Sequence, residues 1–463
     1  MASIDRREFL KGGALAAAGV AASEVLTTSR VAFAAGRRVG GRGDSRLVVV
    51  ILRGAMDGLA AVPPCGDPDY ARLRGEIAIP PPGTAGGALP LDGIFALHPA
   101  FAFLHARYAA GELAVVHAVA SPYRARSHFD GQDVLENGTA QPHAVQTGWL
   151  NRALAALPAA RSSGQTAGRL GREGDRRREL AVALGQNVPL VMRGPIEVAS
   201  WAPSHLASLD EETLQRVQDL YSHDPLLSQR LADALAANAM AADAMSADRM
   251  AAEAMSANAR GADAMGASET ISAGRSGQAA AGTSRPAVSG NARRHTEIVR
   301  AAAGFLRPDD GPRIAVFDTN GWDTHANEGG AQGQLDQRFA ALDAALEMLK
   351  DGLGPAWRDT AVVLVTEFGR TAAVNGTRGT DHGTATVAFL VGGAVRGGRV
   401  IADWPGLSGR ALYQGRDLAP TLDLRSVLKG VLHDHLGVSA HALEASVFPE
   451  SGDARPMRDL IRA

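Results

Sequence analysis

The chain lacks several features that would point to particular classes of protein. Among its 463 residues there is one cysteine, Cys65, so no disulfide can form within the chain. Only three residues are lysines, and the formal net charge of -2 argues against a nucleic-acid-binding protein, which would normally have a strongly basic face. No run of about 18 apolar residues occurs that would span a membrane. We therefore expect neither a nucleic-acid partner nor an integral membrane span in the mature chain.

The first 34 residues have the features of a targeting signal. Twin arginines, Arg6 and Arg7, are followed by Phe-Leu-Lys and by a weakly apolar stretch at residues 12–22. A small-x-small cleavage pattern ends at Ala34. These features predict a twin-arginine signal peptide over residues 1–34, with the twin-arginine translocase as a partner during export. The expected location of the mature protein is periplasmic or secreted.

The remaining chain alternates β-branched apolar runs with helical patterns. This alternation predicts an α/β fold with a mostly parallel, doubly wound sheet. The longest apolar runs resemble strands that are covered on both faces. We expect strands at residues 47–52, 113–117, 179–184, 313–317, 360–365 and 386–391, and helices at residues 332–353 and 422–436.

A Met- and Ala-rich tract at residues 232–290 differs from its surroundings. Methionines recur every five residues from Met240 to Met255. This period places successive side chains about 140° apart on a helix, so they form no single apolar stripe. We interpret the tract as a low-complexity insertion that interrupts one domain spanning residues 45–463. The alternative is a metal-gathering tract, and its thioethers would select soft Cu(I).

Carboxylates and imidazoles follow two of the expected strands in the C-terminal half of the chain. Asp323 and His325 lie in a Gly-Trp-Asp-Thr-His motif after one strand, where Asp318 is a competing carboxylate. After the next strand, Glu367 and Arg370 precede a Gly-Thr-Asp-His-Gly motif that contains Asp381 and His382. Ligands bind at the carboxyl ends of the strands in open α/β sheets, and these side chains are typical ligands of hard or borderline metals. The spacing therefore predicts a metal site at this edge of the sheet.

Four further candidates lie in the N-terminal half. Asp57 follows the first strand in a glycine-flanked turn and is either a metal ligand or the N-cap of the next helix. Ser127 and His128 follow the second strand. Ser127 is either a nucleophile activated by a metal or a helix cap, and His128 is a candidate ligand or acid/base. Arg126, which precedes them, is a candidate for binding an oxyanion.

These motifs together resemble the secreted domain-of-unknown-function 1501 family. The resemblance covers the twin-arginine signal and the five segments at residues 53–58, 126–130, 321–325, 366–371 and 379–383. That family is in turn similar to the alkaline phosphatase and sulfatase superfamily. The relation implies a three-layer sandwich around a mostly parallel central sheet and a two-metal hydrolase site. By order along the chain it implies that Ser127 is the nucleophile and that the metal ligands are Asp57, Asp323, His325, Glu367 and His382.

The chain departs from the superfamily pattern at one position. Superfamily members usually carry Asp-His-Gly where this chain has Glu367-Phe368-Gly369, so one imidazole is missing unless His128 or Asp381 replaces it. One or two divalent ions are expected, with calcium, magnesium, manganese and zinc as the candidates. The sulfatase Cys/Ser-x-Pro-x-Arg signature is also absent, so we expect no formylglycine chemistry.

The sequence therefore predicts an exported, metal-dependent hydrolase of phosphate or sulfate esters, with a small anionic ester as substrate. Ser127 or a water molecule attacks the ester, and Arg370 binds its anionic oxygens. The alternative is a non-catalytic periplasmic binding or assembly protein that keeps a degenerate alkaline-phosphatase-like fold. A periplasmic redox protein is a third hypothesis, but the chain lacks the usual fingerprints of redox cofactors.

Overall fold

The structure is a computed structural model that describes residues 44–158, 180–203 and 290–462, together with residues 221, 227, 228 and 231. The predicted signal peptide at residues 1–34 lies outside the described residues. The predicted insertion at residues 232–290 also lies outside them, except that residue 290 begins a helix. Both predictions therefore remain predictions.

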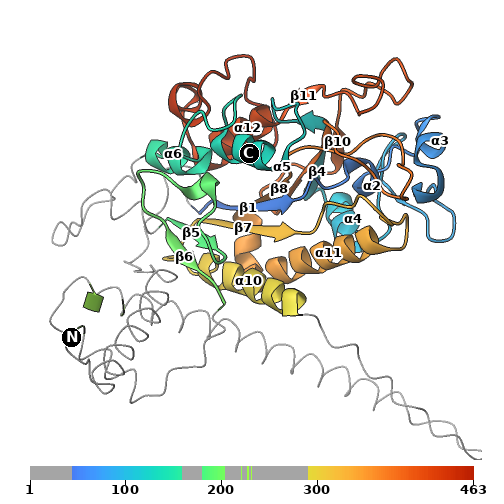
Figure 1. Cartoon of the computed structure of the whole chain (residues 1–463). Coiled ribbons are helices and arrows are strands. Elements are labelled where there is room, and N and C mark those ends of the chain that lie inside the picture. The colour runs from blue at the N-terminus through green and yellow to red at the C-terminus, as the bar shows by residue number, and fades with distance from the viewer. Residues whose placement is uncertain are drawn as a thin grey trace, which may run out of the picture.

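A nine-stranded sheet runs through the described part of the chain (Figure 1). Its strand order is β10-β4-β9-β8-β1-β7-β5-β6, and β11 also pairs with β4. Strand β9 is antiparallel to both of its neighbours, β4 and β8, whereas the other strand pairs of this sheet are parallel. The strands are β1 (Arg46–Arg53), β4 (Leu113–Ala120), β5 (Ala181–Leu184), β6 (Ala199–Trp201), β7 (Ile314–Asn320), β8 (Thr360–Val365), β9 (Thr386–Val391), β10 (Arg399–Ile401) and β11 (Leu422–Asp423). A separate hairpin pairs β2 (Leu89–Pro90) with β3 (Ala96–Leu97).

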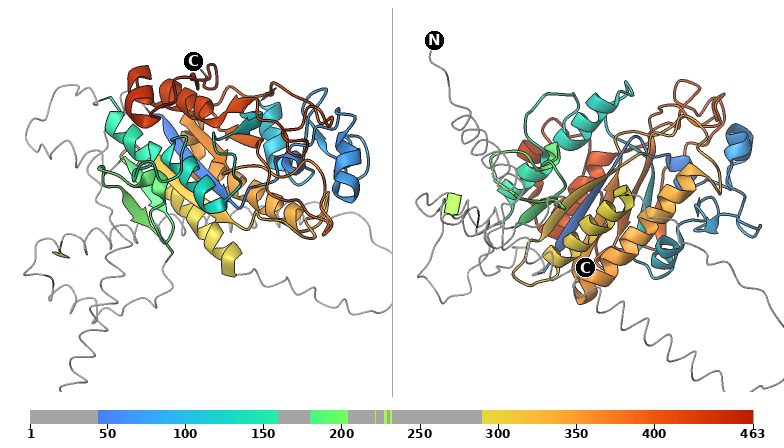
Figure 2. Two further views of the ribbon diagram at one scale, coloured as in Figure 1. Left: turned by 45° about the horizontal axis from the view of Figure 1, so that its top comes forward. Right: turned by 60° about the horizontal axis from the view of Figure 1, so that its bottom comes forward.

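Helices cover both faces of the sheet. Helices α4, α10 and α11 lie on one face, and α5, α6 and α12 lie on the other (Figures 1 and 2). The helices are α2 (Gly58–Ala61), α3 (Tyr70–Arg74), α4 (Ala102–Ala109), α5 (His128–Asn137), α6 (Trp149–Ala156), α10 (Gly290–Leu306), α11 (Gln334–Leu353), α12 (Leu424–Leu436) and α13 (Ala440–Ala442). Short 3₁₀ or π turns occur at η1 (Gly75–Ile77), η2 (Leu190–Met192), η3 (Gly354–Asp359) and η4 (Leu443–Val447). No helix within the described ranges is both long and apolar enough to cross a membrane.

The central strand β1 shows why this sequence forms a covered sheet. Successive side chains of a strand point to opposite faces. Val48, Val50 and Leu52 accordingly pack in the core beneath α10 and α11. Leu47, Val49 and Ile51 pack in the core beneath α6 and α12. A strand that is buried on both faces needs a continuous apolar run rather than an alternating one, and β1 has such a run.

The prediction of an α/β fold with a mostly parallel sheet is confirmed, and the six expected strands and two expected helices are present with small shifts at their ends. The antiparallel β9 makes the sheet mixed, a feature that the apolar runs of the sequence do not indicate.

The direction of β9 also determines which residues meet at one edge of the sheet. Strands β1, β4, β7 and β8 end at this edge. Since β9 runs in the opposite direction, it begins there, and the loop that precedes Thr386 reaches the same edge. The residues that follow β1, β4, β7 and β8 therefore lie close to the residues that precede β9.

Candidate metal centre

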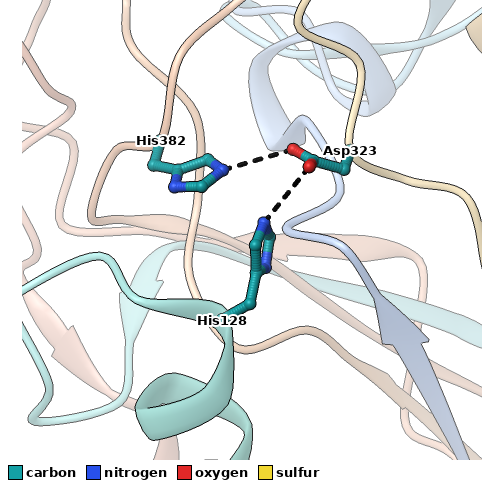
Figure 3. A group of neighbouring side chains, drawn as sticks. All are labelled: His128, Asp323 and His382. Carbon is teal, nitrogen blue, oxygen red and sulfur yellow. Dashed lines mark hydrogen bonds and ion pairs between the residues drawn. The ribbon is translucent and has the colours of Figure 1, made fainter.

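Three side chains converge where these strand ends meet: His128, Asp323 and His382 (Figure 3). His128 is the first residue of α5, Asp323 follows β7, and His382 precedes β9. The Nε2 atom of His128 lies 3.4 Å from Oδ2 of Asp323, and the Nε2 atom of His382 lies 3.2 Å from Oδ1 of Asp323. One ligand atom from each residue lies within 4.8 Å of the other two. The structure thus brings together three of the predicted ligands, which come from three distant parts of the chain.

His325 and Asp381 lie beside this group. The Nε2 atom of His325 is 3.0 Å from Asp323 Oδ1 and 3.0 Å from His382 Nε2, and its Nδ1 atom is 3.4 Å from Asp381 Oδ1. The His325 side chain is 45% exposed, compared with 24% for His128 and 25% for His382. A hydrogen bond from Asn375 and the contact with His325 lower the pKa of Asp381. His325 is therefore the outermost imidazole of the cluster.

Each of the three imidazoles is held from behind at its Nδ1 atom. The acceptor is Glu367 Oε1 for His128, at 2.8 Å, and the backbone carbonyl of Arg126 for His382, at 2.9 Å. Asp381 has the same position relative to His325. An acceptor at Nδ1 fixes the proton there and leaves the lone pair of Nε2 facing the centre, as is typical of histidines that bind metals. Among the described residues, the Nε2 atom of His128 is in addition buried without a hydrogen-bond partner, and a cation would satisfy it.

Glu367 is a buried carboxylate behind His128 rather than a member of the three-residue group. Its Oε1 atom also accepts hydrogen bonds from the backbone N–H of Gly54 at 2.9 Å and from Gln132 at 3.1 Å. Burial opposes ionisation, but these bonds, led by the one to His128, lower the pKa of Glu367. The same hydrogen bond raises the pKa of His128. Glu367 therefore orients an imidazole, and Thr366 in turn bonds its second oxygen.

Arg370 is also placed behind the centre. It is 1% exposed, and one of its terminal nitrogens lies 2.5 Å from Asp323 Oδ1. Partial burial of Asp323 favours the neutral acid, but the guanidinium outweighs this effect and lowers the pKa of Asp323. The guanidinium also donates to the backbone carbonyls of Gly54, Ala55, Trp322 and Thr380. The structure thus places Arg370 as a support for Asp323 and for the surrounding loops, in contrast to the predicted role in binding substrate oxygens.

Asp57 lies outside the three-residue group. It is fully buried and caps α2, where Oδ1 accepts from the backbone N–H groups of Leu59 at 2.9 Å and Ala60 at 3.1 Å. Both of its oxygens are bonded to Arg74. Of the two interpretations that the sequence left open, the structure shows the helix cap. Asp318, the competing carboxylate, is paired with Arg53.

Ser127 and Arg126 precede α5 at the edge of the centre. Ser127 occupies the N-cap position, but its side chain makes no capping hydrogen bond. The Arg126 side chain is bound to Asp417 at 2.6 Å and to Gln414 at 2.8 Å, so it is paired within the protein. Its backbone is in the left-handed region, with φ of 63°, and this conformation accompanies the carbonyl contact with His382.

Two groups close to the centre were not identified from the sequence. The carbonyl of Arg126 has no side-chain signature, so no motif could have indicated it. Glu328 is a buried acid in the loop after β7, and its position a few residues beyond Asp323 was the only available signal.

Comparisons with known proteins place these motif residues in a family. No curated protein and no solved structure matches the chain. The family model described as "protein of unknown function (DUF1501)" matches residues 109–447, a range that includes His128, Asp323 and His382. The chain therefore belongs to the DUF1501 family.

Proposed function

We propose that the protein is an exported, metal-dependent hydrolase of phosphate or sulfate esters. The observation that carries the proposal is the convergence of His128, Asp323 and His382, with the two imidazoles fixed at Nδ1 so that their Nε2 atoms face the carboxylate. A histidine with a purely structural role does not need its Nε2 atom to face a carboxylate, and neither does an acidic cluster on the surface. A site for one divalent cation needs imidazole Nε2 atoms and a carboxylate that face one another.

The donor set fits one ion rather than two, because Asp57 is bonded to Arg74 and Glu367 lies behind His128. Two imidazoles and one carboxylate favour zinc, manganese or a similar transition metal over calcium or magnesium, which prefer all-oxygen sites. Catalytic zinc sites typically have three protein ligands and leave one position open. When bound, the ion would supply Lewis-acid stabilisation of the charge that develops during ester hydrolysis.

The remaining residues have separate proposed roles. His325 is the outermost imidazole and is held by Asp381, so we assign it proton transfer during the reaction. Ser127 directly precedes His128, and its hydroxyl is not used to cap α5, so it remains the proposed nucleophile. Arg370 keeps Asp323 ionised and oriented.

The substrate class and the compartment rest on the sequence. The motif resemblance to the alkaline phosphatase and sulfatase superfamily supports an ester substrate and a three-layer alkaline-phosphatase-like sandwich. The twin-arginine segment in residues 1–34 supports export in a folded state.

The test is metal analysis of protein purified after native export, followed by assays on phosphate and sulfate ester panels with added zinc or manganese. Wild-type protein should contain about one equivalent of metal. Asp323→Ala should contain none, whereas Asp318→Asn, the matched control at the end of β7, should keep the metal and the activity. His325→Ala should keep the metal and lose turnover by about 10²- to 10⁴-fold.

Other outcomes would change the assignment. A wild-type protein with no metal would refute the proposal. A protein that binds one ion but hydrolyses no ester, and in which His325→Ala has no effect, would be a metal-binding assembly protein instead.

A further inference from the structure

Glu328 lies beneath the candidate centre and contacts none of the three proposed ligands. It is fully buried in the loop between β7 and α11. Its Oε2 atom accepts two hydrogen bonds, from the hydroxyl of Thr324 at 3.1 Å and from the hydroxyl of Thr380 at 2.7 Å. Both threonines are themselves buried, so water does not compete for these bonds.

The two threonines belong to the two segments that carry most of the centre. Thr324 lies between Asp323 and His325, and Thr380 directly precedes Asp381 and His382. The backbone N–H of Thr380 also donates to the carbonyl of Thr324 at 3.2 Å. One carboxyl oxygen of Glu328 therefore joins the segment after β7 to the segment before β9.

The same side chain also lies next to the buried ion pair of Asp57 and Arg74. The carboxyl group of Glu328 lies beside that of Asp57, close enough for the two to interact, and within the described part of the chain its Oε1 atom is buried without a hydrogen-bond partner. Two carboxyl groups can share a hydrogen bond only if one of them holds a proton. Burial and the nearby charge of Asp57 raise the pKa of Glu328 well above its usual value. Arg74 balances the remaining negative charge.

We propose that Glu328 is a positioning residue of the metal centre, which fastens both ligand-bearing segments, through Thr324 and Thr380, to the fixed pair of Asp57 and Arg74. The inference rests on the proposed function, since it assigns to Glu328 the alignment of Asp323 and His382 for one ion. Metal ligands are held in position by hydrogen bonds from neighbouring residues. Loss of these hydrogen bonds typically weakens metal affinity by about 10- to 100-fold.

The experiment compares zinc affinity, measured by competition with a chelator, in wild type, Glu328→Gln and Glu328→Ala. A glutamine amide can donate to Asp57 and accept from both threonines, so Glu328→Gln should bind zinc within about threefold of wild type, well short of the 10- to 100-fold loss expected when support is removed. Glu328→Ala should lose about 10- to 100-fold. The double variant Thr324→Val/Thr380→Val, which keeps the acid but removes both hydroxyls, should show a similar loss.

The control for general destabilisation is Asp343→Asn. Asp343 is another buried acid, and it accepts hydrogen bonds from the backbone of Phe103 and Leu104 in α4. This variant should lower the melting temperature while zinc affinity stays unchanged. Zinc affinity equal to wild type in Glu328→Ala, or an equal loss in Asp343→Asn, would overturn the inference.

Amide hydrogen exchange of the metal-free protein provides a readout that does not depend on the proposed function. Glu328→Ala should lose protection in residues 321–328 and 377–384 together, and Glu328→Gln should not. If the wild type binds no metal but this paired loss occurs, the proposed function fails and Glu328 remains the link between the two segments. If metal binds normally and the two segments exchange independently of Glu328, the positioning role fails and the metal centre stands.

Discussion

Two aspartates near the same edge of the sheet are each bound to a buried arginine, yet they have different surroundings. Asp57 is paired with Arg74, and its side chain is 1% exposed. Asp323 is paired with Arg370, and its side chain is 41% exposed. The oxygens of Asp57 are occupied by two backbone N–H groups and by the guanidinium. Those of Asp323 face the guanidinium of Arg370 and imidazoles, with no backbone N–H group among their contacts within the described residues.

The difference shows what separates a structural carboxylate from a candidate ligand. An adjacent arginine lowers the pKa of both aspartates and so does not distinguish them. What distinguishes them is the nature of the other neighbours. Backbone N–H groups are fixed donors that use up the lone pairs, whereas an imidazole nitrogen with a free lone pair leaves room for a cation between itself and the carboxylate.

The largest expected effect comes from removing only the charge of each aspartate. Asp323→Asn should abolish stoichiometric metal binding, because an amide oxygen is a much weaker ligand for a transition metal than a carboxylate. Asp57→Asn should leave the metal content at the wild-type value. Elemental analysis of the two purified variants is the measurement. Loss of metal from the Asp57 variant alone would reverse the roles of the two sites.

The second prediction concerns stability without metal. Asp57→Ala should reduce the free energy of unfolding by about 3–5 kcal/mol, because it leaves the Arg74 charge buried and removes the cap of α2. Asp323→Ala should cost less, since that side chain is partly exposed to water and Arg370 keeps its four backbone carbonyl partners. Urea unfolding of the two metal-free variants gives both values. Equal losses would mean that Asp323 is as much a part of the folded framework as Asp57.

A smaller effect should follow from changing the acid behind His128. Glu367→Gln should weaken metal affinity by about 10- to 100-fold, because it removes the carboxylate that orients the imidazole and enhances its basicity. Gln132→Ala, which removes one donor to Glu367 while the acid stays in place, is the matched control and should change affinity less. Chelator competition provides the comparison, and equal affinities for wild type and Glu367→Gln would remove Glu367 from the centre.

The smallest predicted effect is a dependence of stability on pH. Glu328 has a raised pKa in the folded protein because of burial and of Asp57, so the folded state keeps a proton that the unfolded chain releases above about pH 4.5. The stability of metal-free wild type relative to Glu328→Gln should therefore be highest below pH 4.5 and fall as the pH rises towards the folded pKa. We expect a difference of about 1 kcal/mol between urea unfolding curves at pH 5 and pH 6. A difference that grows as the pH falls would contradict a shared proton.

The sheet was largely predictable because its central strands are continuous apolar runs, which few other structures accommodate. The direction of β9 was not predictable in the same way, since an apolar run has the same composition in either direction. This direction nevertheless decides that His382 approaches the edge where His128 and Asp323 lie.

The candidate site was predictable as a set of residues but not as a geometry. His128 and Asp323 were identified because each lies in a polar segment that follows an apolar run. His382 was identified because it lies in the polar segment between two apolar runs. Asp57 satisfied the same criterion, and the residue that accounts for its different role, Arg74, comes from a short helix with no motif. The sequence could also not indicate that Arg370 points inward, because its partners are mostly backbone carbonyls.

The reversed strand also has a consequence for the order of folding. Strand β9 inserts between β4 and β8, and β4 is far away in the sequence, so the sheet closes through contacts that form slowly. A folding intermediate that lacks β9 would hold His128 and Asp323 without His382. Under the proposed function, such an intermediate would bind the proposed metal ion weakly, and the affinity would reach its final value only when β9 is in place. Metal uptake during refolding would therefore report when the sheet is complete.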